Sequence, residues 1–305
     1  MSEQAAQVIV AGGRRIELSN PSKVLFPDDG ITKADLAEYY AAVAPFALPH
    51  ARRRPVMMER YPDGIGRRPL IQQNAPDYFP DWIERVHVPK EKGNVRHPLI
   101  DVPAAFVYLA NQACVTPHVW LSRTDKIRHP DQLVFDLDPP SDGFEAARRT
   151  ALLVRDVLEE VGLPPFVRTS GGKGLHVLVP LDRSEPYETV RAFAEEVAQE
   201  LVRRDPERLT TEHRIAARDG RLYVDVTRNA YAQTTPATYA VRARPGAPVA
   251  TPLDWSEVED RKILPDRFTL RTVPTRLERD GDLWKGMMRR ARSLRAARGK
   301  LARAP

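Results

Sequence analysis

The sequence predicts an α+β fold in which a βαββαβ module follows an α/β module at the N-terminus. Three observations predict it. Two long segments have the apolar spacing of amphipathic helices, and four short segments have the alternating pattern of half-buried strands. Turn residues separate these segments in the order strand, helix, strand, strand, helix, strand, which is the split-βαβ plan.

The N-terminal module is expected over residues 1–130. Its first strand is "RRIELS", and a helix should begin at Thr32, where Thr-x-x-Asp fits a capping box. A second strand is expected in "RPVMMERYP" and a buried helix in "AAFVYLANQACV". The single cysteine, Cys114, falls in that helix, which favours a small buried hydrophobe over a nucleophile and fits a reducing cytoplasm.

The second module is expected over residues 131–283, followed by a basic C-terminal tail over 284–305. The module begins with strand "QLVFDLD" and a helix over 143–161. Strands "FVRTS" and "LHVLVPL", a helix over 186–204 and strand "RLYVDVT" complete it. Ferredoxin-like and RNA-recognition-motif (RRM) folds share this plan, and their first strand lies between the third and the fourth.

Two aspartates interrupt the apolar run "LVFDLDPP" at positions i and i+2. Because side chains alternate across a strand, Asp136 and Asp138 should point to one face while Phe135 and Leu137 enter the core. A strand ending in an Asp-Pro loop is one interpretation of this run. The other is a divalent-metal site, because carboxylate oxygens are the ligands that Mg²⁺ and Mn²⁺ prefer.

The split-βαβ strand order adds two further polar side chains to that face. His176 on the third strand and Asp225 on the fourth strand should flank the two aspartates, because their apolar neighbours point the other way. Three acids and a histidine on one sheet face favour the metal-site interpretation.

The glycine-rich segment "RTSGGKGLHV" joins two expected strands and does not have the spacing of a Walker loop. It is either a plain hairpin turn or an anion-binding nest of backbone N–H groups at Gly172. In the second case Lys173 supplies a positive charge and Ser170 a hydroxyl donor. Phosphate contacts are also expected from Arg228 and from Arg242 and Arg244, which should share one face of a strand.

The motifs "FDLDPP", "SGGKGLHV" and "YVDVTRN" together resemble those of the archaeo-eukaryotic primase superfamily. They are most similar to the polymerase domain of bacterial ATP-dependent DNA ligase D and its free-standing relatives, from "NPSKVLFP" to "VATPLDW". The resemblance implies a primase-polymerase fold with an RRM-like catalytic module. It implies a template-directed nucleotidyltransferase, a primase-like repair polymerase that extends primers and fills short gaps with dNTP or NTP in end joining or excision repair.

The resemblance also assigns roles to individual residues. It makes Asp136, Asp138 and Asp225 the catalytic ligands of two Mn²⁺ or Mg²⁺ ions. The residues that it places at the incoming nucleotide are Ser170, Lys173, His176, Arg228, Arg244 and His118, although His118 could equally be a packed core histidine. Lys23 matches a lysine near the 5′-phosphate of a downstream DNA strand.

One departure concerns template binding. Ligase-associated members often have two phenylalanines where this chain has Leu70 and Ile71, which removes base stacking worth ~1–3 kcal/mol per base. With no ligase or nuclease domain in 305 residues, we expect a free-standing relative that acts on gapped or broken duplex DNA. Its expected protein partners are a separate ATP-dependent DNA ligase and Ku.

Charge and hydropathy limit the partners and the cellular location that the chain can have. The net charge is +6, and the tail over 284–305 carries eight basic residues and no acid, so the rest of the chain has 6 − 8 = −2. The tail either contacts nucleic acid or is a solvated helix end. No apolar run approaches the ~20 residues of a membrane span, so no membrane partner is expected and the chain should lie in the cytoplasm, at the nucleoid.

Two other functions are alternatives to a polymerase. A metal-dependent phosphohydrolase of the Asp-x-Asp type usually needs a threonine soon after its acids, and "DLDPP" lacks one. A non-catalytic nucleic-acid-binding module on the same sheet would need aromatic side chains where these strands present carboxylates.

Overall fold

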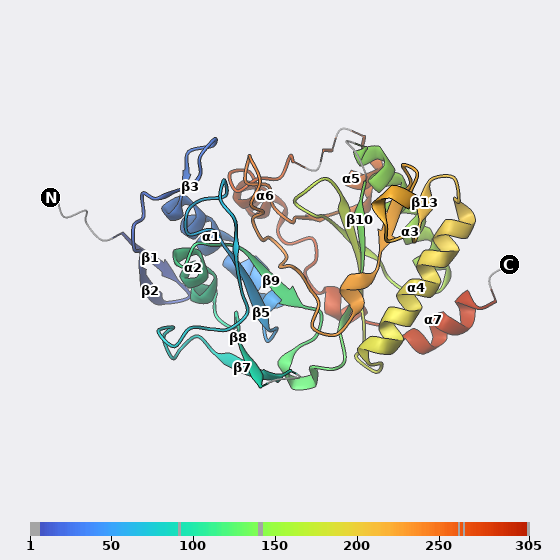
Figure 1. The fold of residues 1–305 in the computed structure, drawn as a ribbon, viewed down its shortest axis with the longest axis horizontal. Coiled ribbons are helices and arrows are strands. Elements are labelled where there is room, and N and C mark those ends of the chain that lie inside the picture. Colours follow the sequence, from blue (N-terminus) through green and yellow to red (C-terminus); the bar gives the residue numbers. More distant parts are fainter. Residues whose placement is uncertain (1–6, 91–92, 140–142, 262, 265, 304–305) are drawn as a thin grey trace. The chain divides into compact units, whose positions relative to one another are not determined.

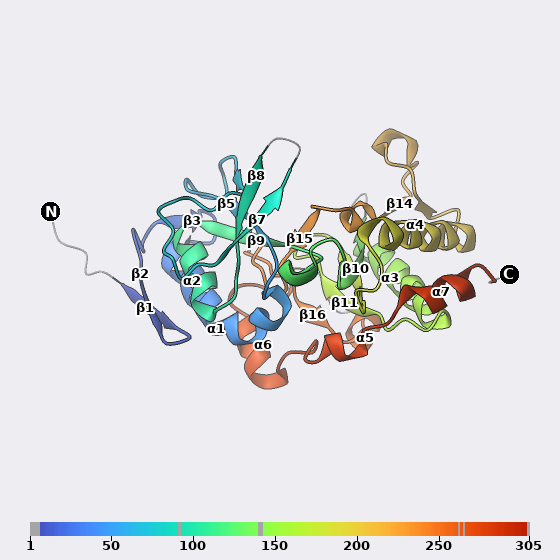
Figure 2. The same cartoon turned by 90° about the horizontal axis from the view of Figure 1, so that it is seen from below.

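The computed structural model divides the chain into two compact units, drawn from two directions in Figures 1 and 2. It describes residues 7–90, 93–139, 143–261, 263–264 and 266–303. The first unit runs to Trp120 and also contains Pro236–Ala250 and Phe268–Gly281. The second consists of Leu121–Thr235, Thr251–Arg267 and the chain from Asp282 onward. None of the helices in these ranges combines the length and the apolar character that crossing a membrane requires.

The first unit combines short antiparallel strand pairs with helices. Its strands are β1 (Val8–Ala11), β2 (Arg14–Glu17), β3 (Val24–Phe26), β4 (Ile31–Thr32), β5 (Val56–Arg60), β6 (Leu70–Gln72), β7 (Arg85–Pro89), β8 (Asn94–Pro98) and β9 (Cys114–Trp120). Its helices are α1 (Lys33–Ala51), α2 (Pro103–Asn111) and α6 (Val273–Asp280). The pairs are β1 with β2, β3 with β4 and β7 with β8, and β5 lies between β6 and β9.

One of two predictions for the helices of this unit is confirmed, and the other is partly wrong. The capping box at Thr32 is confirmed, because its hydroxyl accepts from the backbone N–H of Asp35 while the Asp35 carboxylate accepts from Thr32. The helix expected to include Cys114 is wrong beyond Asn111. Ala113 takes a φ of 56°, which ends the helix, and Cys114 begins the buried strand β9.

A late segment of the chain, Pro236–Ala250, belongs to the first unit, and buried hydroxyls of α1 and β9 form hydrogen bonds with its backbone. Tyr39 donates to the carbonyl of Tyr239 at 2.8 Å, and Thr116 donates to the carbonyl of Val241 at 2.7 Å. The hydroxyl of Tyr40 accepts from the N–H of Val241 at 3.1 Å. The units therefore differ from the ranges expected from the sequence, which ended at residues 130 and 283.

The second unit contains the predicted βαββαβ module. Its strands are β10 (Gln132–Asp138), β11 (Phe166–Thr169), β12 (Leu175–Pro180), β13 (Leu209–Thr210), β14 (Leu222–Asp225) and β16 (Pro252–Leu253). Its α-helices are α3 (Phe144–Glu160), α4 (Tyr187–Arg204), α5 (Trp255–Glu259) and α7 (Leu294–Leu301). Its 3₁₀ helices are η1 (Thr124–Lys126), η2 (Ile215–Ala217), η3 (Thr227–Asn229) and η4 (Met287–Arg290). The chain returns to the first unit at β15 (Thr234–Pro236).

The strand order of this unit confirms the split-βαβ prediction. The six-stranded sheet has the order β13-β14-β10-β12-β11-β16, so β10 lies between the third and fourth strands of the predicted module. Phe135 and Leu137 of β10 are fully buried, as the alternation predicts. The edge strands β13 and β16 were not predicted, because two residues are too few to show alternation.

An asparagine completes the pairing of β10 where β14 ends. β14 pairs with β10 as far as Asp225. Beyond that point the side chain of Asn229 accepts from the N–H of Val134 at 2.9 Å and donates to its carbonyl at 2.7 Å. A fully buried amide thus replaces one rung of the ladder and holds η3 against β10.

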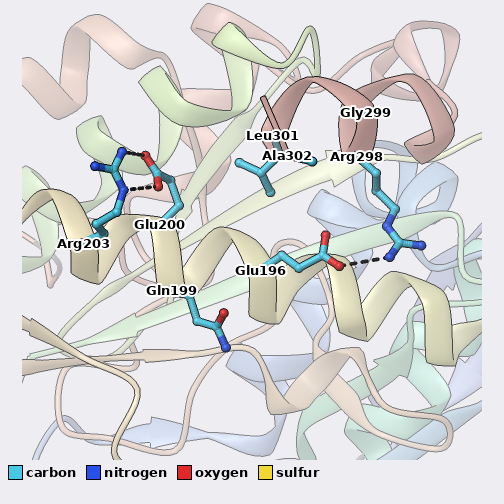
Figure 3. A pocket seen from close by; sticks show the side chains of 8 residues that line it. All are labelled: Glu196, Gln199, Glu200, Arg203, Arg298, Gly299, Leu301 and Ala302. Carbon is cyan, nitrogen blue, oxygen red and sulfur yellow. Dashed lines mark hydrogen bonds and ion pairs between the residues drawn. The ribbon is translucent and has the colours of Figure 1, made fainter. Parts of the chain in front are cut away.

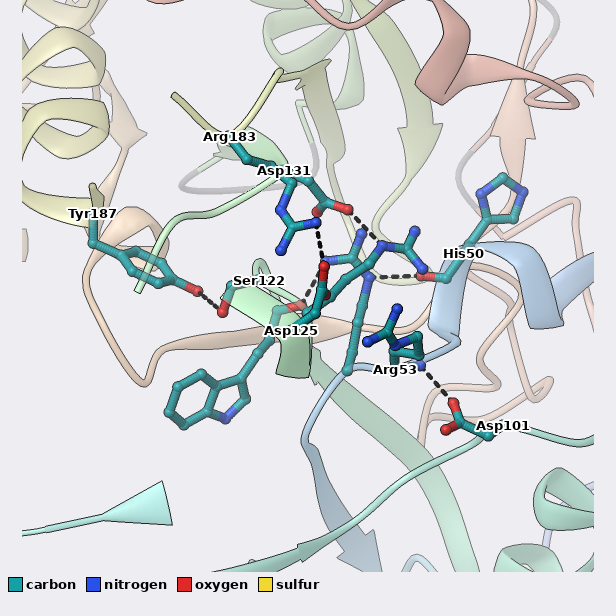
Figure 4. A network of polar contacts seen from close by, with 11 residues as sticks. His50, Arg53, Asp101, Ser122, Asp125, Asp131, Arg183 and Tyr187 are labelled. Carbon is teal, nitrogen blue, oxygen red and sulfur yellow. Dashed lines mark hydrogen bonds and ion pairs between the residues drawn. The ribbon is translucent and has the colours of Figure 1, made fainter. Parts of the chain in front are cut away.

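Polar contacts fix the segment that leads into β10. Tyr187 donates to Ser122 at 3.0 Å, and Arg183 donates to Asp125 at 2.8 Å (Figure 4). In the same segment the fully buried Asp131 accepts from Arg123 at 2.7 Å. These contacts tie the segment before β10 to the chain that follows β12.

The expected C-terminal tail is folded as part of the second unit. Trp284 is 1% exposed in a core cluster with Leu121, Val134, Leu178, Tyr187 and Met287. Farther along, the backbone of Arg292 bonds to Pro180 and Asp182 at the end of β12. Helix α7 then lies beside α4, where Arg298 donates to Glu196 at 3.0 Å (Figure 3).

We predict that Trp284→Ala will destabilise the second unit by about 3–5 kcal/mol, because it removes a fully buried indole from the core. Chemical denaturation followed by fluorescence and circular dichroism will measure the change. The neighbouring Leu283→Ala is the control, since Leu283 is 37% exposed and should cost little. Equal effects of the two substitutions would contradict a core role for Trp284.

Candidate active site

The acidic face of the second unit is built by the register of three strands. Asp136 of β10 lies directly opposite His176 of β12 and, on its other side, opposite Asp225 of β14. Asp138 lies opposite Tyr223 in the same way. Directly paired residues share a sheet face, so the structure brings these five side chains together on one face, as the sequence predicted for four of them.

Two of the three acids have close polar neighbours. The Asp136 carboxylate lies 3.3 Å from Nε2 of His176, and Oδ1 of Asp225 accepts from the N–H and the hydroxyl of Thr227 at 2.8 and 2.6 Å. Asp138 is exposed. Across the ranges that the structure describes, no three His, Cys, Asp or Glu side chains already stand close enough to hold a metal ion.

The pKa of Tyr223 is affected by the negative charge of this face. Burial, and after it the nearby charge of Asp225, raise the pKa of its phenol to about 12. The hydroxyl lies 3.0 Å from Nδ1 of His213. Tyr223 was not singled out from the sequence, although its place two residues before Asp225 puts it on the same strand face.

Arg168 contacts the histidine of the acidic face from the neighbouring strand β11. Its guanidinium lies 3.1 and 3.3 Å from Nδ1 of His176, and both side chains are almost fully buried. The two residues are directly paired on β11 and β12. Sequence reasoning assigned no role to Arg168, although its position at the start of the glycine-rich motif, facing His176 across a hairpin, was a usable signal.

The glycine-rich hairpin is organised by Ser170. Its hydroxyl accepts from the N–H groups of Gly172 and Gly174 at 3.1 and 3.3 Å. The nest expected at Gly172 is therefore wrong for these two amides, because Ser170 already accepts from them. Lys173 is exposed at the tip of the turn, where a cationic side chain can reach a bound anion.

Gly174 lets the hairpin approach the aspartates. A Cβ atom at this position would lie 2.1 Å from the carbonyl oxygen of Leu137 and 2.7 Å from the Asp138 carboxylate. No side chain fits there, so glycine is required by the close approach of β10. Gly174 was not among the predicted site residues. Its position between Lys173 and the strand that bears His176 could have indicated that the site needs it.

In the first unit, His118 is bound to an acid that the sequence analysis overlooked. Nε2 of His118 lies 2.9 Å from Glu59, and the hydroxyl of Tyr61 donates to the same carboxylate at 2.7 Å. Burial alone would raise the pKa of Glu59, but these hydrogen bonds and the charges of His118 and Arg242 lower it to about 2. His118 and Arg242 thus share one anionic neighbour.

The other predicted residues have less defined surroundings. Arg228 is half-buried in η3 of the second unit. In the first unit, Arg242 and Arg244 do not share a strand face as expected, because the chain turns there and the N–H of Arg244 donates to the carbonyl of Arg242. Lys23 is 41% exposed just before β3, with Asp63 at 3.7 Å.

A hollow of about 580 Å³ lies elsewhere in the second unit, between α4 and α7 (Figure 3). Its lining residues are Glu196, Gln199, Glu200, Arg203, Arg298, Gly299, Leu301 and Ala302. None of the predicted site residues is among them, and its charges pair with one another. The acidic face is therefore the better candidate for chemistry.

Comparisons with known proteins agree on one family. Residues 32–284 match the family described as LigD, primase-polymerase domain. The chain is 34% identical over 285 residues to the multifunctional non-homologous end joining DNA repair protein LigD of Mycobacterium tuberculosis. It is 32% identical over 269 residues to the bifunctional non-homologous end joining protein LigD of Bacillus subtilis. These matches cover 90% and 88% of the chain but 37% and 43% of the relatives.

A solved structure is also similar to most of the chain. It is the polymerase domain from Mycobacterium tuberculosis ligase D in complex with DNA, with a TM-score of 0.85 and 33% sequence identity. The match covers 91% of this chain and 99% of that one.

We predict that Gly174→Ala will destabilise the hairpin by about 1–3 kcal/mol, because its Cβ must displace the β10 backbone next to Asp138. Thermal unfolding and the chemical shifts of the β10 amides will report the change. Gly66→Ala is the matched control, since a Cβ there meets nothing within 4 Å. An unchanged β10 spectrum would refute the close-approach argument.

We predict that the Glu59 contacts stabilise the first unit at neutral pH and are lost in acid. The pKa of Glu59 falls to about 2 on folding, so its contribution is complete above the unfolded value near 4.5 and disappears as the pH falls toward 2. It amounts to about 3 kcal/mol at most. Urea unfolding of wild type and Glu59→Gln across this range should show curves that converge at low pH. Parallel curves would contradict the prediction.

Proposed function

The chain belongs to the LigD primase-polymerase family, and on that premise we propose that it is a template-directed nucleotidyltransferase, a primase-like DNA repair polymerase. It would extend primers and fill short gaps with dNTP or NTP in end joining or excision repair. The relatives named above are end-joining proteins, and the chain spans less than half of their length. We therefore propose for this chain the polymerase activity alone.

The observation that carries this proposal is the acidic face of the RRM-like sheet. Asp136, Asp138 and Asp225 are placed there by strand register, and His176 lies beside them. Nucleotidyl transfer from a triphosphate uses divalent cations that offset the charge of the phosphates, and carboxylates are the side chains that hold such cations. The face is more specific than the fold, which hosts many functions.

The three carboxylates fit a pair of hard divalent cations by their chemistry. Their oxygen donors suit Mg²⁺ or Mn²⁺, and the direct opposition of Asp136 and Asp225 places two like charges side by side, where a cation offsets the repulsion. Such ions, when bound, lower the pKa of a primer 3′-hydroxyl and neutralise charge on a triphosphate. We propose Asp136, Asp138 and Asp225 as their ligands.

The residues around the hairpin would bind the incoming nucleotide. Lys173 lies at the exposed tip of the turn that Ser170 and Gly172 shape, and His176 presents its ring beside Asp136. Arg228 follows Asp225 in η3. In the first unit, we propose nucleotide contacts for His118, held by Glu59, and for the arginines 242 and 244.

DNA is the proposed macromolecular substrate, as a gapped or broken duplex. The relative solved with DNA supports this choice. Leu70 and Ile71 are 49% and 54% exposed on β6, so aliphatic side chains take the place of the aromatic pair found in many relatives. We also propose a separate ATP-dependent ligase and Ku as protein partners, and the nucleoid as the place where the chain acts. Family membership favours the polymerase over the phosphohydrolase and the non-catalytic module.

We predict that Asp136→Ala, Asp138→Ala and Asp225→Ala will each abolish primer extension on gapped DNA, because the acids serve the cations. DNA affinity measured by fluorescence anisotropy should change little. Asp156→Ala on α3 is the control, since this acid lies on an exposed helix face. Near-wild-type turnover in any one of the three variants would remove that residue from the proposed ligand set.

We predict that Lys23 gives a preference for gaps with a 5′-phosphate. A lysine gains a charge-assisted contact with phosphate that a hydroxyl cannot offer, worth about 1–2 kcal/mol. Gap filling on 5′-phosphorylated and 5′-hydroxyl substrates should differ for the wild type and be equal for Lys23→Ala, with extension of a simple primer-template preserved. Equal loss on every substrate would assign Lys23 to folding instead.

A further inference from the structure

We infer that Arg168 is a positioning residue that fixes the tautomer and orientation of the His176 ring on the acidic face. This inference deepens the proposed function and rests on it where it concerns nucleotide binding. Arg168 is 1% exposed and His176 is 3% exposed, so neither side chain has bulk water as an alternative partner. Their direct pairing on β11 and β12 keeps the two side chains on the same face.

The chemistry of the contact determines the tautomer. A guanidinium carries only donors, and it lies 3.1 and 3.3 Å from Nδ1 of His176. Nδ1 must therefore be the acceptor nitrogen of the ring. The ring proton is then on Nε2, which faces the Asp136 carboxylate at 3.3 Å. Arg168 thus donates to His176, and the protonated ring nitrogen is the one nearer to Asp136.

The guanidinium is itself held in place by an apolar wall. Trp284 lies under it, with Cζ of Arg168 5.8 Å from the ring centroid, and Phe166 packs edge-on against the same indole. Cation–π contact and burial keep the guanidinium aimed at Nδ1 rather than at solvent. A residue of the expected C-terminal tail thus supports a side chain at the proposed nucleotide site.

The test compares Arg168→Met and Arg168→Lys with the wild type in the full chain. Methionine keeps the bulk and removes the donors, whereas lysine keeps the charge with a single donor group. Arg148→Met is the matched control, because Arg148 is an equally buried arginine of this unit that donates to the backbone carbonyls of Val258 and Ile263. Circular dichroism and thermal unfolding will establish that each variant is folded.

The first readout is the ¹⁵N spectrum of the His176 ring, without metal or nucleotide and assigned with His176→Gln. We expect one Nε2-protonated tautomer in the wild type and in Arg148→Met, and a mixture of tautomers in Arg168→Met. An Nδ1-protonated ring in the wild type would overturn the inference. So would a wild-type ring spectrum in folded Arg168→Met.

The second readout is the affinity for dATP with MgCl₂, measured by calorimetry. We expect Arg168→Met to weaken it about tenfold, the size of one misdirected hydrogen bond, with DNA affinity unchanged. Recovery in Arg168→Lys without recovery of the ring spectrum would show that charge alone matters and would overturn the positioning role. A wild-type chain that binds no dATP would contradict the proposed function, while the ring spectrum still reports the Arg168–His176 contact.

Discussion

Like charges on adjacent strands are the constraint around which the second unit is built. Asp136 and Asp225 face each other directly across β10 and β14, an arrangement that costs free energy unless something compensates it. The unit keeps this register because β10 is the central strand, paired on both sides, and because the Asn229 side chain continues its ladder past the end of β14. Core packing therefore maintains the charge arrangement that proposed cation binding uses.

The two histidines predicted to bind nucleotide are held by partners of opposite charge. Arg168 donates to Nδ1 of His176, so this ring nitrogen is an acceptor, whereas the Glu59 carboxylate accepts from Nε2 of His118, so that ring nitrogen is a donor. The same residue type is thereby set up for two different electrostatic tasks. The distinction lies wholly in residues on neighbouring strands, since each histidine by itself could adopt either form.

The βαββαβ module could be predicted because its long helices and strands show clear periodicity, and its strand order then placed Asp136, Asp138, His176 and Asp225 on one face. What the sequence could not reveal depends on close approach and on single backbone angles. Gly174 is needed because β10 passes within contact distance, and Ala113 ends α2 in a conformation usual for glycine. Arginines 242 and 244 were assigned to a strand because their spacing of two mimics alternation, while the chain turns there.

The division into six alternating segments means that the chain passes between the units five times. During synthesis the N-terminal 120 residues emerge first, yet the buried hydroxyls of Tyr39 and Tyr40 find their partners near residue 240. The first unit therefore cannot complete its core until most of the chain has left the ribosome. A product terminated near residue 235 would leave those hydroxyls of α1 without their late partners and expose that face to chaperones and proteases.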